Sequence, residues 1–157
     1  MSNLNDNTRR LLGVTTGQTS IVISTGAYAA GDSLGGLIEF DVRRAGGGGR
    51  LTDFYLEDVG NQSAAMTLYF FDKKPTVIAD NAAVLSGLAL ADIQANILTK
   101  ALVTYEVMNS IGKVHLSHIE QDFESTSGKL YLYAVMDGII TYPAATNISM
   151  SIIALLN

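Results

Sequence analysis

The chain has 157 residues, of which 48% are hydrophobic and 16% charged, with a net charge of −5 and no cysteine. This length suits one domain with a sizeable core. The charged fraction lies below the roughly 25% of an average soluble domain, and the mean hydropathy is +0.25. The acidic balance argues against nucleic acid as a partner, and the lack of cysteine excludes disulfides and thiolate metal sites.

The polar N-terminus has no apolar run of the kind found in signal peptides, and no apolar stretch approaches the roughly 18 residues of a membrane helix. We therefore expect synthesis in the cytoplasm, no export by the usual route and no membrane partner. Residues 1–10 are polar and rich in Asn, which predicts a flexible arm that becomes ordered only against a partner. Residues 11–157 are expected to form a single domain.

From residue 11 onward, short stretches of alternating hydrophobicity are separated by turn residues. They predict about eight strands, over 11–15, 19–24, 37–42, 51–59, 66–71, 100–108, 129–136 and 147–155. Long segments between some of these strands favour a jelly-roll-like β-sandwich over an up-and-down barrel. An immunoglobulin-like sandwich is the alternative, although its Cys and Trp landmarks are missing.

Three segments between the predicted strands stand out. Residues 43–50 contain four consecutive glycines flanked by arginines and predict a long loop, which is a candidate contact element. Within residues 76–98, Leu90, Ile93 and Ile97 follow the spacing of one helix face and predict one short helix. Residues 109–127 carry both histidines and have no strand pattern.

Two of the predicted strands are apolar on both faces. In residues 129–136, Leu130, Leu132 and Ala134 occupy one face, while Tyr131 and Tyr133 occupy the other with Val135. The core of one sandwich buries only one face of each sheet, so the second face predicts a partner surface, such as a neighbouring subunit. The other explanation for the apolar content is a large core with Ala- and Gly-rich loops.

Residue patterns that would carry catalysis are missing. The Gly46–Gly49 run lacks the Lys-Ser/Thr and the helix of a phosphate loop. His115 and His118 would point to opposite faces of a strand, so they would share a metal only in a loop. The carboxylates at 57–58 and 120–124 match no calcium loop and are expected to be solvated. We therefore predict no enzyme, no metal and no cofactor.

Basic side chains cluster at Arg9-Arg10, at Arg43-Arg44 with Arg50, and at Lys73-Lys74. They are interpreted as solvated loop charges, or alternatively as contacts to an acidic protein surface. Tyr131 and Tyr133 lie two residues apart on one strand face. They suit either a stacking surface for sugars or an anchor in a protein interface, and we favour the interface because buried Tyr is enriched there.

Three further segments resemble those of small virion proteins of tailed bacteriophages. They are Ala27–Ile38, Tyr69–Pro75 leading to Asp80-Asn81, and Gly128–Tyr133 leading to Tyr142. Together they cover about half of the chain and share an order of turn and strand residues. The family they resemble is the capsid decoration or cement proteins, which belong to the auxiliary proteins of the phage head.

The resemblance implies a β-sandwich or jelly roll that assembles as a homotrimer. It further implies binding to the major capsid protein between capsomers, on the outside of the virion, with no enzymatic activity. It also implies that the N-terminal arm clasps a neighbouring subunit. The composition of the chain suggests contacts by Leu4, Arg9, Arg10, the Arg43–Arg50 loop, Leu90, Ile93 and Ile97. A carbohydrate- or receptor-binding module of a tail or fibre, and a cupin-like metalloprotein using His115 or His118, are the alternatives.

Overall fold

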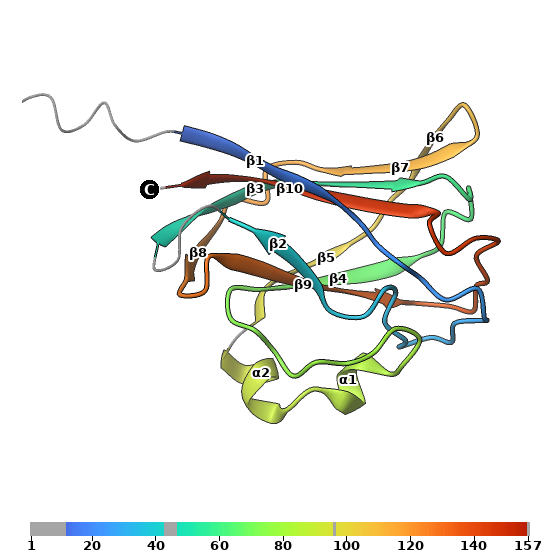
Figure 1. Ribbon diagram of the computed structural model, residues 1–157, viewed down its shortest axis with the longest axis horizontal. Helices are drawn as coiled ribbons and strands as arrows, with labels where there is room; N and C mark the ends of the chain where they lie inside the picture. Colours follow the sequence, from blue (N-terminus) through green and yellow to red (C-terminus); the bar gives the residue numbers. More distant parts are fainter. Residues whose placement is uncertain (1–11, 43–46, 96, 157) are drawn as a thin grey trace, which may run out of the picture.

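The computed structural model describes residues 12–42, 47–95 and 97–156, with the backbone alone described at 12–20, 95, 97–100 and 102. Ten described strands form two sheets that pack face to face (Figure 1). The all-β sandwich that the sequence predicts is confirmed.

The first sheet has the order β1–β10–β3–β7–β6, and β8 also pairs with β3. Its strands are β1 (Leu12–Ser20), β10 (Ile148–Leu156), β3 (Gly47–Asp58), β7 (Ile111–Leu116), β6 (Glu106–Met108) and β8 (Gln121–Ser125). The second sheet has the order β2–β9–β4–β5. Its strands are β2 (Ile38–Asp41), β9 (Lys129–Met136), β4 (Met66–Phe71) and β5 (Ile97–Leu102).

The connections between these strands define the topology. When β6, β7 and β8 are taken as one unit along β3, every connection crosses between the sheets except the one from β4 to β5. All the strand pairs are antiparallel. This arrangement is the jelly roll, in which two interlocked Greek keys form a sandwich.

Three strand predictions need correction. Residues 109–127, for which no strand was predicted, contain β7 and β8, which pair with successive parts of β3. Their alternation is hidden because Gly112 takes an inward position and because His118 and Glu120, both at positive φ, separate the two strands. The predicted strand over 100–108 is divided between β5 and β6, and the two short strands predicted over 11–24 are replaced by the single strand β1.

The main core lies between the two sheets and is built from the inward face of each strand. Its members include Phe40, Phe54, Phe70, Leu132 and Ile152, all nearly inaccessible to solvent. The rings of Phe54 and Phe70 meet edge to face at 5.7 Å, which links β3 of one sheet to β4 of the other. Alternation along the strands therefore fixes which residues enter this core.

A second, smaller core covers the outer face of the second sheet. Here Phe71, Tyr131, Tyr133 and Val135 pack beneath the segment 72–95, whose helices are α1 (Val84–Gly87) and α2 (Leu90–Ala95). Figure 1 shows both helices on the far side of β4 and β9 from the first sheet. The predicted face assignment is confirmed, because Leu130, Leu132, Ala134 and Met136 enter the main core instead.

The partner surface inferred from these double-sided strands is wrong. The chain itself covers the second face, because the long β4–β5 connection folds back over it with Ile78, Val84 and Leu88. Because the chain buries this second face itself, the structure supports a large core as the explanation of the high apolar content. One helix with Leu90, Ile93 and Ile97 on one face is also wrong: two short helices form, and Ile97 is the first residue of β5.

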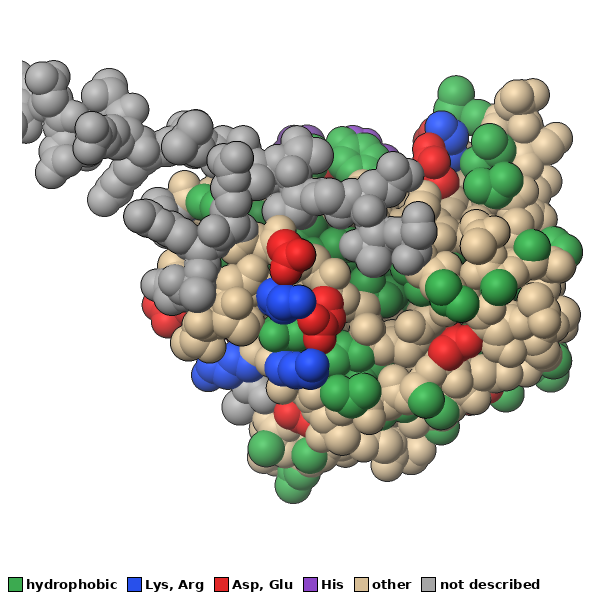
Figure 2. All heavy atoms as spheres, in the orientation of Figure 1, with side chains coloured by type: hydrophobic (Ala, Val, Ile, Leu, Met, Phe, Trp, Pro, Cys, Tyr) green, Lys and Arg blue, Asp and Glu red, His purple; other side chains and the backbone are tan. Residues whose placement is uncertain are grey.

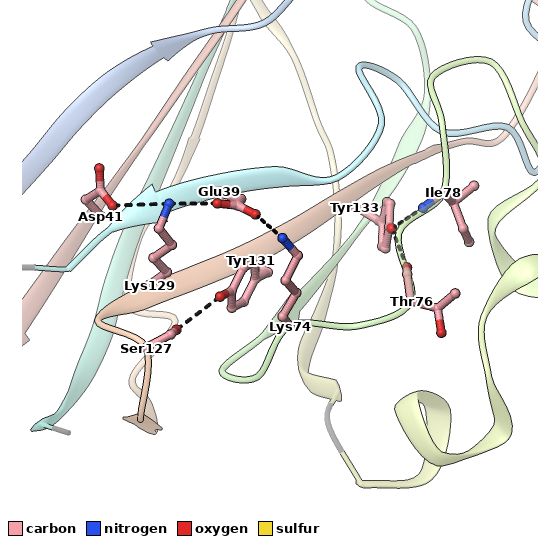
Figure 3. A network of polar contacts seen from close by, with 9 residues as sticks. All are labelled: Glu39, Asp41, Lys74, Thr76, Ile78, Ser127, Lys129, Tyr131 and Tyr133. Atoms are coloured by element: carbon pink, nitrogen blue, oxygen red, sulfur yellow. Dashed lines mark hydrogen bonds and ion pairs between the residues drawn. The ribbon is translucent and has the colours of Figure 1, made fainter. Parts of the chain in front are cut away.

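Hydrogen bonds attach this covering segment to the sheet (Figure 3). The Tyr133 hydroxyl donates to the Thr76 carbonyl oxygen at 2.7 Å and accepts from the Ile78 amide at 2.9 Å. The Thr76 amide and hydroxyl both donate to Asp92 Oδ2, which ties α2 to the start of the segment. Helices as short as α1 and α2 are not stable alone, so these tertiary contacts hold them.

An ion-pair group lies at the edge of the same sheet. Glu39 on β2 accepts from Lys129 at 2.7 Å and from Lys74 at 2.9 Å, and Lys129 also lies near Asp41 (Figure 3). The hydrogen bonds from Lys129 and Lys74 lower the pKa of the Glu39 carboxyl. These contacts join β2, β9 and the start of the covering segment.

Candidate interaction surface

Four connections meet at one end of the sandwich, which we call the loop end. They are the β1–β2 connection (21–37), the β3–β4 connection (59–65), the β5–β7 connection (103–110) and the β9–β10 connection (137–147). In a jelly roll the chain crosses between the two sheets at alternate ends of the sandwich, so these four connections lie at the same end. The loop end is on the right in Figure 1, opposite the end of β10.

Backbone hydrogen bonds join neighbouring loops. The Tyr28 amide donates to the Ile140 carbonyl at 2.8 Å, and the Ile23 amide donates to Ala145 at 3.0 Å. The Val59 amide donates to the Asn147 carbonyl at 2.8 Å. The β9–β10 connection is therefore hydrogen-bonded to both the β1–β2 and the β3–β4 connections, which fixes these three loops relative to one another.

The Asp80 carboxylate fixes the β1–β2 connection further. It accepts from the Ser24 amide at 2.6 Å, the Gly35 amide at 2.6 Å and the Tyr28 hydroxyl at 2.8 Å. Burial, together with the hydrogen bond to Asp80, raises the pKa of the Tyr28 phenol. Because Asp80 belongs to the 72–95 segment, the loop end and the covering segment are connected.

A group of buried polar side chains underlies the loop end. Asp58 is inaccessible to solvent, and its Oδ2 accepts from the Gln62 and Ser63 amides, both at 2.9 Å. These bonds hold the tight β3–β4 turn, in which Asn61 and Ser63 adopt positive φ. Burial is the main cause that raises the pKa of Tyr105 and Tyr142, and the charge of nearby Asp58 adds to it.

Large aliphatic side chains are exposed on the loop end. Ile139 is 82% exposed and Val22 is 74% exposed. Val59, Val107 and Met108 are each more than half exposed. Val107 and Met108 lie at the tip of the β6–β7 hairpin, whose turn residues Asn109 and Ser110 both have positive φ.

The loop end is also poor in charge. None of the ten Lys and Arg residues of the chain falls in its four connections, which contain only Asp32, Glu106 and Asp137 as acidic residues. In Figure 2 the hydrophobic side chains at the right lie among mostly uncharged atoms, while most visible Lys and Arg side chains gather in the other half. Single exposed aliphatic residues are ordinary, but five on one end with few charged residues are typical of a surface that contacts protein.

The opposite end holds a wide cleft of about 870 Å³. Its lining includes Gly47–Gly49, Arg50, Asp72, Lys73 and Glu124. Arg50 pairs with Asp122 at 2.7 Å and with Glu120 at 3.2 Å, and its hydrogen bond lowers the pKa of the Asp122 carboxyl. With its guanidinium already paired to two carboxylates and acidic groups around it, this cleft is a poor site for an anion.

The residues predicted to make contacts are spread over the molecule. Leu4, Arg9, Arg10, Arg43 and Arg44 lie outside the described residues. Arg50 is exposed on β3 and lines the cleft. The loop predicted over Arg43–Arg50 is therefore wrong from Gly47 onward, where β3 begins. Leu90 and Ile93 are exposed on α2, far along the chain from any loop of the loop end.

Tyr131 and Tyr133 are not surface residues. They are 2% and 0% exposed, and the hydroxyl of Tyr131 lies 3.0 Å from that of Ser127. The interpretation of both as an interface anchor or a sugar-stacking surface is wrong, because the chain's own covering segment packs over them. Their burial also removes the stacking surface, which together with the acidic loops motivated the carbohydrate-binding alternative.

The two histidines do not form a common site. His115 on β7 stacks on Tyr55 with ring centroids 4.3 Å apart, and its Nε2 lies 2.9 Å from Asp53 Oδ1. Burial opposes ionisation of Asp53, but hydrogen bonds to His115 and Thr52, together with the nearby histidine charges, outweigh it and lower the pKa of that carboxyl. His118 lies in the link between β7 and β8. Among the residues that the structure describes, no three His, Asp or Glu side chains are grouped to hold a metal ion.

The comparisons with known proteins add no family. The chain matches no protein-family model, no curated protein and no solved structure. Within the described ranges, no helix is both long enough and apolar enough to cross a membrane. The class that the coordinates define is therefore the jelly-roll β-sandwich.

The loop end was not predicted from the sequence. The signal present in the sequence was a set of segments that combine turn residues with isolated aliphatic residues and no basic residue, as in Asp137-Gly138-Ile139. Such segments look like ordinary loops until the topology shows that four of them share one end.

Proposed function

We propose that this protein is a structural virion protein that decorates the outside of a bacteriophage capsid. In this proposal the loop end docks onto the major capsid protein between capsomers and stabilises the shell. The observation that carries the proposal is the group of five exposed aliphatic side chains on one end, whose four connections contain no Lys or Arg. The partial resemblance of three segments to decoration proteins supplies the kind of partner.

The energetics of the loop end favour docking onto protein. Burial of apolar surface contributes about 25 cal/mol per Å², offset by the cost of ordering the groups that come together. Hydrogen bonds already fix Tyr28, Val59 and Asn147, so little ordering of these three loops remains to oppose association. Nucleic acid is disfavoured as a ligand of this end because a phosphate backbone requires Lys or Arg.

The proposal assigns no catalytic step and no cofactor to the chain. It places the protein on the capsid exterior after synthesis in the host cytoplasm, with the major capsid protein as its partner. Leu90 and Ile93 on α2 are a second predicted contact, because both are exposed and lie outside the loop end.

The test is cosedimentation of the purified protein with undecorated heads of the parent phage. Wild-type protein is expected to bind, and Ile139→Asp and Met108→Asp are expected to weaken binding at least about tenfold because each buries a charge in the contact. Val77→Asp is the matched control, since Val77 is also largely exposed but lies in the covering segment.

Failure of the wild-type protein to cosediment would contradict the proposal. A Val77→Asp variant that binds as poorly as Ile139→Asp would show that the loop end has no special role. Loss of binding in Leu90→Asp, with Ile139→Asp unaffected, would move the docking surface to α2.

A further inference from the structure

Strand β1 is the edge of the first sheet. It pairs with β10 on one side, over Leu12–Thr16 and again at Thr19 and Ser20. Along its other side, no strand of the described part of the chain is paired with it. Alternate residues along the nine-residue strand therefore direct their backbone N–H and C=O groups to this side, which is visible as the long blue strand in Figure 1.

The other sheet edges carry charged residues that discourage pairing with another chain. β2 contains Glu39 and Asp41, β5 contains Lys100, and β8 contains Asp122 and Glu124. β6 has only three residues and begins with Glu106. Charged residues and short length are the usual protections of an exposed edge.

β1 lacks these protections. Its sequence, LGVTTGQTS, contains no charged residue and no proline. Its one irregularity lies between Thr16 and Thr19, so the first five residues keep a regular antiparallel register with β10. This regular stretch, Leu12–Thr16, is a template for strand addition.

We propose that the open edge of β1 pairs with β1 of a second copy of this chain, in antiparallel orientation about a two-fold axis. Antiparallel pairing of Leu12–Thr16 with itself places Val14 opposite Val14, and it satisfies edge amides and carbonyls of both chains. The two first sheets become one continuous sheet that runs through both subunits.

The absence of charged residues on β1 favours a second copy of this chain as its pairing partner. The chain has a net charge of −5, so most self-contacts oppose like charges, whereas β1 against β1 brings none together. Self-pairing at β2 or β8 would place carboxylates against carboxylates, and self-pairing at β5 would place Lys100 near its own copy. The two-fold pairing replaces the homotrimer implied by the family resemblance, and it requires no capsid.

The experiment measures the mass of the full-length protein by sedimentation velocity over a range of concentrations. The wild-type protein is expected to form a particle of two chains. Thr15→Lys places a charge within the regular stretch, next to the central Val14 and opposite Ile153 of β10 in the register. We expect it to weaken the dimer about tenfold or more, because it brings like charges together in an interface. Thr15→Ser is the uncharged control and is expected to dimerise as the wild type does.

Charge-swapped mixing separates pairing from misfolding. Thr15→Glu alone is expected to lose the dimer as Thr15→Lys does, while an equimolar mixture of the two is expected to recover two-chain particles. If the variants fail to fold, hydrogen exchange of the wild-type protein provides the readout, with amides of Leu12–Thr16 slowing as concentration rises.

A wild-type monomer at every concentration, a trimer, or a Thr15→Lys variant that still dimerises would overturn the proposal. Exchange of the β1 amides that does not depend on concentration would do the same. Binding to phage heads is scored separately, so a monomer that still decorates heads contradicts the β1 pairing and leaves the proposed function standing.

Discussion

Tyr133→Phe tests whether hydrogen bonding holds the covering segment on the second sheet. The substitution keeps the ring, which is fully buried and meets Phe71 edge to face at 6.1 Å. It removes only the hydroxyl that donates to the Thr76 carbonyl and accepts from the Ile78 amide. The packing of the second core is therefore unchanged, and the measured effect belongs to these two bonds.

The expected cost follows from what each partner loses. The Ile78 residue is buried, so its amide is left without an acceptor, which costs about 1–3 kcal/mol. Thr76 is exposed, so its carbonyl recovers a bond to water and loses about 1 kcal/mol or less. Together these give a fall in the free energy of unfolding of about 2–3 kcal/mol, or roughly 4–12 °C in Tm for a domain of this size.

Tyr131→Phe is the matched control on the same strand face. The Tyr131 ring is equally buried, but within the described part of the chain its hydroxyl hydrogen-bonds to the hydroxyl of exposed Ser127. Its loss is expected to cost about 0.5–1 kcal/mol. Urea denaturation followed by circular dichroism measures both variants. A Tyr133→Phe variant no less stable than Tyr131→Phe would refute the reasoning, and unchanged exchange of the Ile78 amide would show that it keeps an acceptor.

Three further predictions concern other parts of the molecule. Gly49→Ala is expected to cost about 1–3 kcal/mol in denaturation, because a methyl group there meets the Leu155 carbonyl and lies 2.8 Å from the Phe123 ring; a neutral result would mean that β3 and β10 separate easily. The lowered pKa of Glu39 implies stability that is complete above its ordinary value of 4.5 and lost as the pH falls through the lower folded-state value, so Glu39→Gln should flatten the unfolding free energy across that acidic window, and an unchanged slope would contradict it. On the loop end, Ile139→Asp should leave the Tm within about 2 °C of the wild type, since exposed substitutions have small effects, while weakening capsid binding at least about tenfold; a large loss of stability would show that Ile139 is part of the fold.

Much of the sandwich follows from local pattern. The alternation in β9 sorts its residues correctly between the two faces, and the same is true of Met66, Leu68 and Phe70 on β4. β7 and β8 were not predicted, because Gly112 contributes no hydrophobic signal and because the link at His118 interrupts the alternation. Their pairing is specified by β3, which lies more than fifty residues earlier in the chain.

The candidate site was less accessible to sequence reasoning. Tyr131 and Tyr133 were interpreted as partner contacts because their strand is apolar on both faces, yet Ile78, Val84 and Leu88 of the same chain complete the second core. Arg50 was grouped with a glycine loop but belongs to β3 and is paired with Asp122 and Glu120. Periodicity reports that a face is buried and carries no information about which segment buries it.

The sequence by itself determined the all-β class, the main-core faces of the central strands and the near absence of residue patterns for catalysis, because these depend on local alternation and residue chemistry. Only the tertiary structure decided that the 72–95 segment covers the second sheet, that four loops without Lys or Arg share one end, and that β1 is an edge with no second partner among the described strands. These features arise from contacts between residues far apart in the chain. Their formation depends on topology and on the loss of chain entropy that long-range contacts must offset, which no local window of sequence contains.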